Sequence, residues 1–293
     1  MSYVLTLVTP THDANLLNEA ASRMLNQPYM LGASVRTLDA DRALDMVLQA
    51  SSDTLASLRS QCAGALTGLK LDWALQDEAG RAKSLLLADM DSTMITVECI
   101  DELADFAGLK AEISAVTEAA MQGKLEFLEA LTARVALLKG LSTTALETCY
   151  TDRVRPTAGA ASLLTAAKGA GMRAVLVSGG FTFFTQRIAS LLGFDRHVAN
   201  ELEVAASALT GRVVPPLSGP DTKVAVLKEE AAAAGIPLSA VVAVGDGAND
   251  IPMLQAAGFG VAFKAKPAAA AAADARIEYG DLTTLAYFLG LKP

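Results

Sequence analysis

An uninterrupted apolar run, Leu85-Leu86-Leu87-Ala88, constrains the fold most, because it leads directly into the pair Asp89 and Asp91. A half-exposed strand alternates apolar and polar residues, so a continuous run predicts a strand buried on both faces. Sheets of that kind bind their ligands at the carboxyl ends of the strands. The two aspartates are therefore predicted to lie in a functional site, although alone they also suit a solvated turn or a helix cap.

A second buried strand is predicted at residues 240–244, and acidic residues follow it as well. The segment that follows is Gly245-Asp246-Gly247-Ala248-Asn249-Asp250. Two acidic turns at the ends of two strands can converge on one hard cation. Mg²⁺ prefers carboxylate oxygens together with water and substrate phosphate, so the two turns predict a magnesium site.

A third predicted strand, residues 173–177, ends in Ser178-Gly179-Gly180. A hydroxyl and two glycines let backbone N–H groups approach an anion, and the helix N-terminus that follows favours negative charge. The alternative is an ordinary glycine-rich turn. Lys223 follows Asp221, a candidate helix cap, at a place where the helix dipole disfavours a lysine; a solvated side chain is the alternative.

In this order the segments resemble the four motifs of the haloacid dehalogenase-like phosphohydrolases, and within them most closely those of the phosphoserine phosphatases. The matching segments are Asp89-Met90-Asp91-Ser92-Thr93, Ser178-Gly179-Gly180, Lys223 and residues 245–250. Residues 97–102 and 127–141 resemble the substrate-binding parts of that family. The resemblance covers roughly residues 80–293.

The resemblance implies a role for each residue. Asp89 would be the nucleophile that forms an aspartyl-phosphate, and Asp91 would move the proton as acid and then as base. Mg²⁺ would bind the carboxylates of Asp89 and Asp246 and the backbone carbonyl of Asp91, while Asp250 would support these ligands. The groups that would hold the phosphoryl oxygens, orient the site or contact the substrate are Ser178, Gly179, Lys223 and Asn249.

By the same resemblance, Glu98 would bind the ammonium of an amino-acid substrate and Arg134 its carboxylate, with Met121 and Phe127 as apolar residues above it. One acid and one bidentate base suit such a substrate. The alternatives are a helix N-terminal acid for Glu98, a solvated arginine for Arg134 and ordinary packing for the apolar pair. Positions three and four before Arg134 are apolar, so an ion pair along the helix explains it less well.

The first 76 residues predict a small separate α+β domain. Strands are predicted at residues 3–9, 32–38, 43–48 and 69–75, and helices at residues 13–25, capped by Asp13, and 53–66. This βαββαβ order is ferredoxin-like and resembles the ACT-type amino-acid-sensing modules. The alternatives are a regulatory domain that binds serine and a dimerisation domain that would make the protein a homodimer.

Residues 77–293 are predicted to form the phosphatase domain, with a polar linker at residues 76–83. Strands separated by helical stretches predict an α/β fold with a Rossmann-like parallel sheet. Residues 98–154 look helical and are too many for a simple crossover, so they are predicted to form a cap over the strand ends. Pro267 and the alanines at 268–273 predict a short helix.

Composition argues against several other functions. The net charge of −8 disfavours non-specific nucleic-acid binding, which requires a basic face. No apolar run reaches the roughly 18 residues of a membrane span, and no signal peptide is visible, so a cytoplasmic protein without a membrane partner is expected. The cysteines Cys62, Cys99 and Cys149 lack metal-type spacing and are expected to be reduced thiols.

The resemblance implies Mg²⁺-dependent hydrolysis of O-phospho-L-serine to L-serine and phosphate, the last step of serine biosynthesis. The close alternatives are hydrolysis of another small phosphomonoester and transfer of phosphate to an alcohol. A different class of function is an amino-acid sensor that binds without turnover. Such a sensor is expected to have lost Asp89, Asp91 or Lys223, and all three are present.

Overall fold

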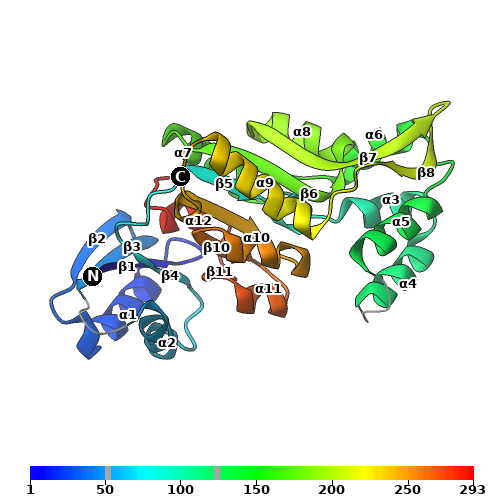
Figure 1. The fold of residues 1–293 in the computed structure, drawn as a ribbon. Helices are drawn as coiled ribbons and strands as arrows, with labels where there is room; N and C mark the ends of the chain where they lie inside the picture. The colour runs from blue at the N-terminus through cyan, green and yellow to red at the C-terminus, as the bar shows by residue number, and fades with distance from the viewer. Residues whose placement is uncertain (50–53, 122–125) are drawn as a thin grey trace.

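The strands of the molecule form a single sheet. The computed structural model describes residues 1–49, 54–121 and 126–293, and in these the strand order is β2-β3-β1-β4-β11-β10-β9-β5-β6-β7-β8. Figure 1 shows the N-terminal strands and helices at one end, the core in the middle and the helices α3–α6 at the other end. The strands are β1 Ser2–Val8, β2 Ser34–Asp39, β3 Ala43–Gln49, β4 Asp72–Asp77, β5 Leu85–Ala88, β6 Arg173–Phe181, β7 Arg196–Ala205, β8 Ala208–Val214, β9 Val241–Gly245, β10 Phe259–Phe263 and β11 Ala275–Ile277.

The three strands predicted from the apolar runs are neighbours in the parallel part of this sheet. Strand β5 lies between β9 and β6 and runs parallel to both. In register, Ala88 at the end of β5 pairs with Val244 on one side and with Leu176 on the other. The carboxyl ends of the three strands therefore meet at one edge, which confirms the predicted α/β fold.

Helices cover both faces of the parallel strands. Leu86 belongs to an apolar cluster with residues of α7 (Ala160–Gly169), α8 (Thr182–Leu192) and α12 (Thr283–Phe288). Its neighbour Leu87 belongs to a second cluster with residues of α9 (Pro220–Ala233) and α10 (Ile251–Ala256). Successive residues thus bury opposite faces, as the uninterrupted run predicts. Among the described residues, no helix is both long and apolar enough to cross a bilayer.

The first four strands form an antiparallel sheet in the order β2-β3-β1-β4. The helices α1 (Ala14–Leu25) and α2 (Leu55–Ala65) pack on one face, so the predicted βαββαβ succession is observed. Asp13 accepts the N–H of Leu16 at 3.0 Å and caps α1, as predicted. The fourth strand begins at Asp72 rather than at residue 69, and the predicted helix start at residue 53 lies outside the described residues.

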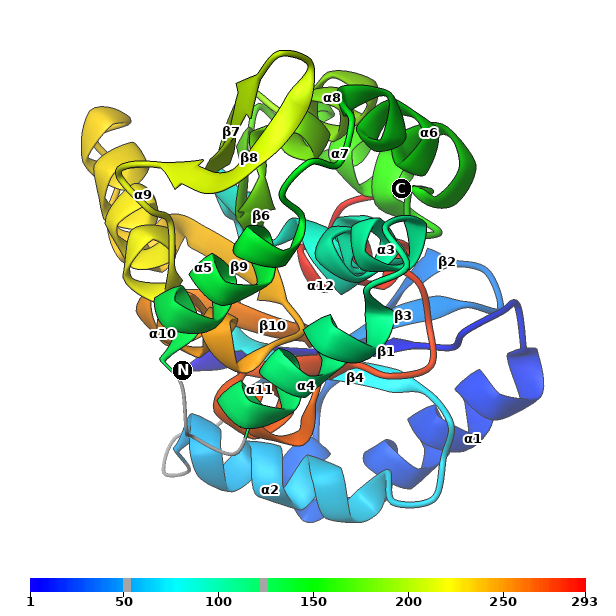
Figure 2. The same ribbon diagram turned by 90° about the vertical axis from the view of Figure 1, so that its right-hand side faces the viewer.

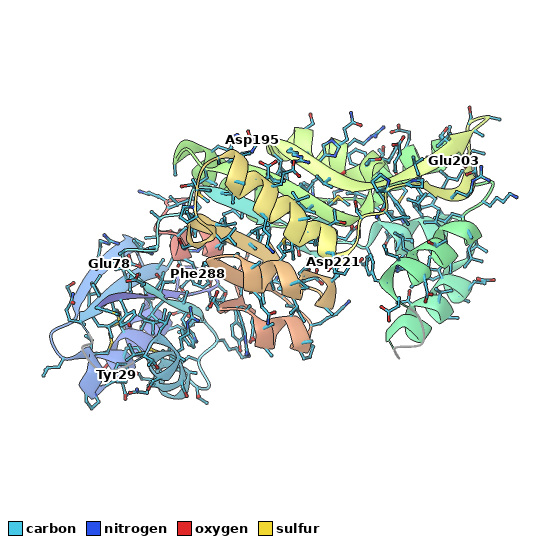
Figure 3. The ribbon with its side chains drawn as sticks, viewed as in Figure 1. Tyr29, Glu78, Asp195, Glu203, Asp221 and Phe288 are labelled. Atoms are coloured by element: carbon cyan, nitrogen blue, oxygen red, sulfur yellow. The ribbon has the colours of Figure 1, made fainter. Side chains whose placement is uncertain are left out.

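The connection between the N-terminal strands and the core is anchored rather than solvated. Arg81, within the predicted polar linker, is only 7% exposed. Its guanidinium donates to the buried Asp45 at 2.6 and 2.9 Å and to the carbonyls of Tyr287 and Phe288 at 2.7 and 3.0 Å. Figure 3 labels Phe288 where these two parts of the molecule meet. Arg81 therefore joins β3 to the C-terminal helix α12.

The predicted helical cap is observed between β5 and β6. Its helices in the described residues are α3 Cys99–Phe106, α4 Lys110–Met121, α5 Phe127–Leu137 and α6 Thr143–Arg153. The β7–β8 hairpin, which was not predicted, hydrogen-bonds to it through Gly140 N to Leu209 O at 2.8 Å and Thr143 N to Ser207 O at 2.9 Å. Figure 2 views α3, α4 and α5 from their outer side. The short helix α11 (Pro267–Ala272) confirms the alanine-rich prediction.

Replacing Arg81 by alanine is expected to destabilise the whole chain. The change leaves the buried Asp45 carboxylate without its main partner, and breaking a buried ion pair in this way costs about 3–5 kcal/mol. Arg36→Ala is the matched control, because Arg36 pairs with the same carboxylate but its side chain is 60% exposed; a loss below about 1 kcal/mol is expected. Urea unfolding measures both, and equal losses would contradict the buried anchor.

Candidate active site

Asp89 and Asp91 lie at the carboxyl end of β5 and point into the molecule. Asp89 is 4% exposed and Asp91 is 9% exposed. The chain turns sharply just after Asp91, because Ser92 adopts a positive φ of 54° and Ile95 N donates to Met90 O at 3.0 Å. This local turn keeps both carboxyl groups at the edge where β5, β6 and β9 end.

Lys223 joins two of the acidic residues from different strands. Its ammonium donates to Asp89 Oδ1 at 2.6 Å and to Asp250 Oδ1 at 2.5 Å, and its side chain is 1% exposed. The helix α9 that carries it starts at Pro220 with Gly219 as N-cap; Asp221 lies in the first turn and makes no cap, so that prediction was wrong. Pro220 fits because the first helical position needs no N–H donor. Lys223 thus fixes the orientation of the Asp89 carboxylate.

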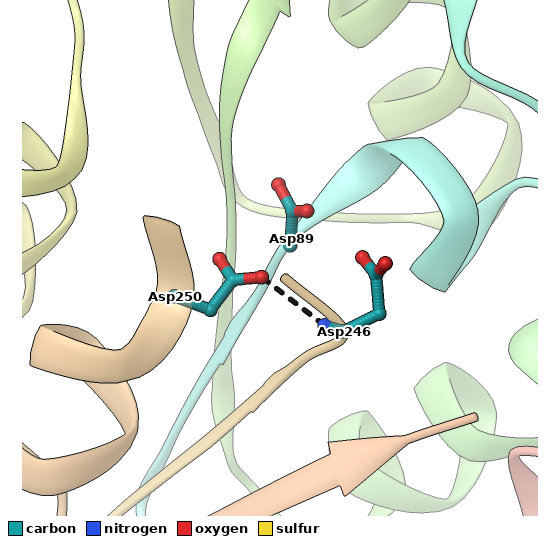
Figure 4. Close-up of side chains that lie close together, drawn as sticks. All are labelled: Asp89, Asp246 and Asp250. Carbon is teal, nitrogen blue, oxygen red and sulfur yellow. Dashed lines mark hydrogen bonds between the residues drawn. The ribbon is translucent and has the colours of Figure 1, made fainter. Parts of the chain in front are cut away.

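Asp250 is engaged through both of its oxygens. Besides the ammonium, it accepts the N–H groups of Asp246 at 3.1 Å and Gly247 at 3.0 Å on its Oδ2. Figure 4 shows Asp89, Asp246 and Asp250 close together, with the bond from Asp246 to Asp250 dashed. Asp250 therefore holds the turn that carries Asp246.

The acidic cluster fits a hard divalent cation. One carboxylate oxygen from each of Asp89, Asp246 and Asp250 lies within 4.8 Å of the others. Asp89 and Asp250 share the one buried ammonium of Lys223, and Asp246 forms no ion pair in the described residues, so the cluster has more acids than paired cations. Among the described residues, no hydrogen-bond donor contacts Oδ2 of Asp89 or Oδ2 of Asp246. Asp246 Oδ2 and one oxygen of Asp89 could bind a metal directly and leave the other Asp89 oxygen for chemistry, whereas both oxygens of Asp250 are already engaged.

The pKa values reflect this crowding of acids. Burial raises the pKa of Asp89 well above its usual value, and Asp250 raises it further while Lys223 opposes the shift. Burial and Asp250 raise the pKa of Asp246 to about 6, against the opposing charge of Lys266. A bound dication would favour the ionised forms of both, since an opposite charge nearby lowers a carboxyl pKa.

Asp91 is held by neutral donors. Its Oδ1 accepts the N–H of Cys99 at the start of α3 at 2.9 Å, and its Oδ2 accepts the hydroxyl of Ser178 at 3.0 Å. Ser178 in turn accepts the N–H of Gly180 at 2.8 Å. Burial raises the pKa of Asp91, although these hydrogen bonds oppose the shift. A carboxyl group in this setting can carry a proton and release it.

The two glycines after Ser178 leave no room for a side chain. A Cβ on Gly179 would lie 2.8 Å from the ring of Phe127, and one on Gly180 would lie 2.7 Å from Asp91 Oδ2. The glycines therefore allow the cap residue Phe127 and the acid Asp91 to approach the end of β6. The glycine turn is a close-packed part of the site.

The predicted residues line one cavity of about 170 Å³ between the strand ends and the cap. Ser92 donates to Glu98 at 2.6 Å, and burial together with Asp91 raises the pKa of Glu98 to about 7. Arg134 uses only its Nε, on the carbonyl of Ala130 at 3.3 Å, so its terminal nitrogens have no partner in the described residues. The lining residues include Asp89, Asp91, Glu98, Phe127, Arg134, Ser178, Gly179, Asp246 and Asn249.

Three predicted residues are not among the lining residues, and one of them, Asp250, lies beside the cavity and holds the turn that carries Asp246. Lys223 is absent from the cavity lining and contacts Asp89 from behind it. Met121 ends helix α4, but its side chain lies outside what the structure describes. Cys99 is 1% exposed and serves as a packing residue, as expected; it, Cys62 and Cys149 are all free and buried. The structure brings the other residues together, and their individual roles stay predictions.

Three further residues belong to the site, and the sequence analysis missed their roles. Thr93 donates to Asp246 Oδ1 at 3.3 Å, and Lys266 lines the cavity. Asn200, fully buried on β7, donates to Gly179 O at 2.9 Å and accepts the N–H of Ser218 at 2.7 Å. It ties the glycine turn to the start of α9. A single asparagine between Ala199 and Glu201 gave no signal in the sequence.

Comparisons with known proteins agree with this geometry. The model of the haloacid dehalogenase-like hydrolases matches residues 86–255. A phosphoserine phosphatase of Polaromonas sp. is 45% identical over 223 residues, which cover 74% of this chain and 94% of that protein. The family model spans the ends of β5, β6 and β9, which carry the site.

Solved structures match both the core and the whole chain. A solved phosphoserine phosphatase described as a phospho-aspartyl intermediate analogue is 40% identical, with a TM-score of 0.66 over 71% of this chain and 99% of that one. A HAD family hydrolase from Salmonella enterica subsp. enterica serovar Typhi is 28% identical, with a TM-score of 0.85 over 99% of both chains. The N-terminal strands are therefore part of an arrangement seen in another hydrolase.

Replacing Gly180 by alanine is expected to destabilise the chain by about 1–3 kcal/mol, because the new methyl group must displace the buried Asp91 or Ser178. Gly169→Ala is the matched control. Gly169 ends helix α7, and a Cβ there meets nothing within 4 Å, so the change should be neutral or stabilise by up to about 1 kcal/mol. Thermal and urea unfolding measure both, and a neutral Gly180→Ala would contradict the close packing.

Proposed function

This chain belongs to the haloacid dehalogenase-like hydrolases, and we propose that it is an Mg²⁺-dependent phosphatase that converts O-phospho-L-serine to L-serine and phosphate. The observation that carries the proposal is the cavity itself. It brings the oxygen of Asp89 that Lys223 does not hold together with an acid, Glu98, and an arginine, Arg134. Phosphoryl transfer and amino-acid recognition are thus combined in about 170 Å³, a volume suited to a small substrate.

In the first step, Asp89 Oδ2 attacks the phosphorus atom and the bond from phosphorus to the serine oxygen breaks. Lys223 holds the other oxygen of Asp89, so the attacking oxygen has a fixed direction. Asp91 gives its proton to the departing serine oxygen, for which its raised pKa suits it. The phosphoryl group is then bound to Asp89 as an acyl phosphate, and L-serine leaves.

In the second step, Asp91 takes a proton from water as the water oxygen attacks the phosphorus atom. The bond between phosphorus and Asp89 breaks, which releases inorganic phosphate and restores both carboxyl groups. Bound Mg²⁺, held by Asp89 and Asp246, would supply positive charge against the repulsion between an anionic nucleophile and an anionic phosphoryl group. The solved relative described as a phospho-aspartyl intermediate analogue supports this route.

The cap residues account for the choice of substrate. Arg134 has free terminal nitrogens, which suit a bidentate contact with the substrate carboxylate. Glu98 has a pKa of about 7, so it is ionised above that pH and can then pair with the substrate ammonium. Phe127 approaches Gly179 at the phosphate end. We assign the cap to recognition and the strand ends to chemistry.

The N-terminal strands and helices, residues 1–76, are proposed to form a regulatory or dimer-forming domain. The proposal rests on their ferredoxin-like strand order. Deleting them would expose the side of α12 that contacts β1 and β4, and it would remove Asp45, the ion-pair partner of Arg81. Their role is therefore better tested by measuring the serine response and the oligomeric state of the full chain.

Wild-type protein is expected to release phosphate from O-phospho-L-serine only with Mg²⁺, and Asp89→Asn is expected to lower turnover at least roughly 1,000-fold, because an amide is a poor nucleophile. Phosphate release from a panel of small phosphomonoesters, with and without Mg²⁺, measures reaction, substrate and metal together. Asp221→Asn is the control, since Asp221 is an exposed acid in the first turn of α9 and should leave turnover near normal. Near-normal turnover by Asp89→Asn would refute the covalent route.

Arg134→Ala is expected to lower kcat/KM for O-phospho-L-serine by roughly 100-fold, as losing one partner of a buried charge pair does. The value for O-phosphoethanolamine, which lacks the carboxylate, should change little. Arg153→Ala, a cap arginine that pairs with Glu102 and Asp105 and lies outside the cavity lining, is the control. Equal losses on both substrates would argue against carboxylate binding by Arg134 and favour a phosphatase of another phosphomonoester.

A further inference from the structure

The acidic side chains that line the cavity repel the anionic substrate proposed for it. Four acids line it, namely Asp89, Asp91, Glu98 and Asp246, and the chain as a whole carries a charge of −8. The ammonium of Lys223 is already shared by two buried carboxylates and lies behind Asp89. A phosphomonoester is anionic near neutral pH, so its approach needs positive charge that is free and near the opening.

Two cationic side chains line the cavity, and they differ in exposure. Arg134 is half-buried in the cap, where burial lowers its pKa. Lys266 is exposed, and its ammonium makes no hydrogen bond or ion pair with any described residue. Of the two cations, Lys266 is therefore the one that an entering anion can contact while the anion is still hydrated.

The backbone fixes Lys266 beside the predicted metal ligand. Its N–H donates to the carbonyl of Asp246 at 2.9 Å, and it is the N-cap residue of α11, directly before Pro267. A residue before proline is restricted to an extended conformation, which the φ of −63° and ψ of 151° show. The position of the Lys266 Cα is thus fixed, while its flexible four-carbon side chain can adjust the position of the ammonium to a ligand.

The charge of Lys266 acts on both ends of the cavity. It lowers the pKa of Asp246 at the phosphate end and that of Glu98 at the end proposed for the amino group. Lys266, Glu98 and Asp246 line the same cavity, so an anion that enters it comes close to this positive charge.

We propose that Lys266 is a substrate-binding residue that draws the anionic phosphoester into the cavity and offsets the acids around the phosphoryl group. The inference rests on the proposed phosphatase function and adds a residue to it. Electrostatic attraction of this kind raises the rate of association and depends on ionic strength. It stabilises the bound substrate and the transition state alike, so it acts on KM more than on kcat.

Lys266→Gln is expected to lower kcat/KM for O-phospho-L-serine about tenfold at low salt while kcat changes less than about threefold. The fall of kcat/KM with added NaCl should be shallower than in the wild type. Lys266→Arg should restore most of the loss, because it keeps the charge. Unchanged melting temperatures would show that folding is intact.

Lys264→Gln is the matched control. It removes the same charge only two residues away, but Lys264 is exposed, lies near the Phe263 ring at 5.6 Å and is not part of the cavity lining. It should leave kcat/KM within about twofold of the wild type, since Lys264 does not line the cavity that the anion enters. Equal effects of the two glutamine variants would overturn the proposal.

A binding measurement separates this inference from the proposed function. Inorganic phosphate with Mg²⁺ should raise the melting temperature of the wild type, and Lys266→Gln should need about tenfold more phosphate for the same shift, whereas Lys264→Gln should not. If the wild type does not hydrolyse O-phospho-L-serine, the proposed function fails, and the phosphate titration still decides the role of Lys266. Equal phosphate response in all variants would reject that role.

Discussion

The buried ammonium of Lys223 is the interaction on which the rest of the site depends. Burial alone would lower its pKa, but Asp250 and Asp89 raise the pKa above its ordinary value and keep the group charged. One side chain from α9 thereby links the end of β5 to the turn after β9. A buried charge persists only when it is paired in this way. If β5 and β9 were not paired side by side, Asp89 and Asp250 would not both reach the ammonium of Lys223.

The sequence predicted the core and the chemistry because both depend on local patterns. The run Leu85-Leu86-Leu87-Ala88 indicated burial on both faces, and the acidic and glycine turns marked the strand ends. The β7–β8 hairpin and Asn200 were missed because their importance comes from contacts across the fold. Asn200 matters only because Gly179 and Ser218, distant in sequence, meet beside it. No local pattern indicates such a meeting.

The N-terminal strands show a second limit of prediction from sequence. The polar segment at residues 76–83 was predicted to be a linker, but its sequence gave no sign that Gln76 donates to Phe288 O at 2.8 Å or that Arg81 is buried in the junction. Asp72 accepts the N–H groups of Glu278, Tyr279 and Gly280 at 2.8, 3.1 and 2.7 Å. These side-chain bonds hold the turn after β11 beside β4, next to the pairing of Arg276 in β11 with Trp73 in β4. A polar residue signals solvent only when no distant partner satisfies it.

The paired aspartates of the opening motif differ because their partners differ. Asp89 faces a permanent positive charge on one oxygen, which favours its ionised form and leaves the other oxygen for attack. Asp91 faces an N–H and a hydroxyl, neutral donors that position it without fixing its charge. Burial raises the pKa of both acids, so the unequal roles of nucleophile and proton carrier also require a bound dication that favours the ionised form of Asp89. The sharp turn at Ser92 follows Asp91 directly, and beyond it the first N–H of α3, that of Cys99, comes back to Asp91 and supplies the neutral donor that Asp89 lacks.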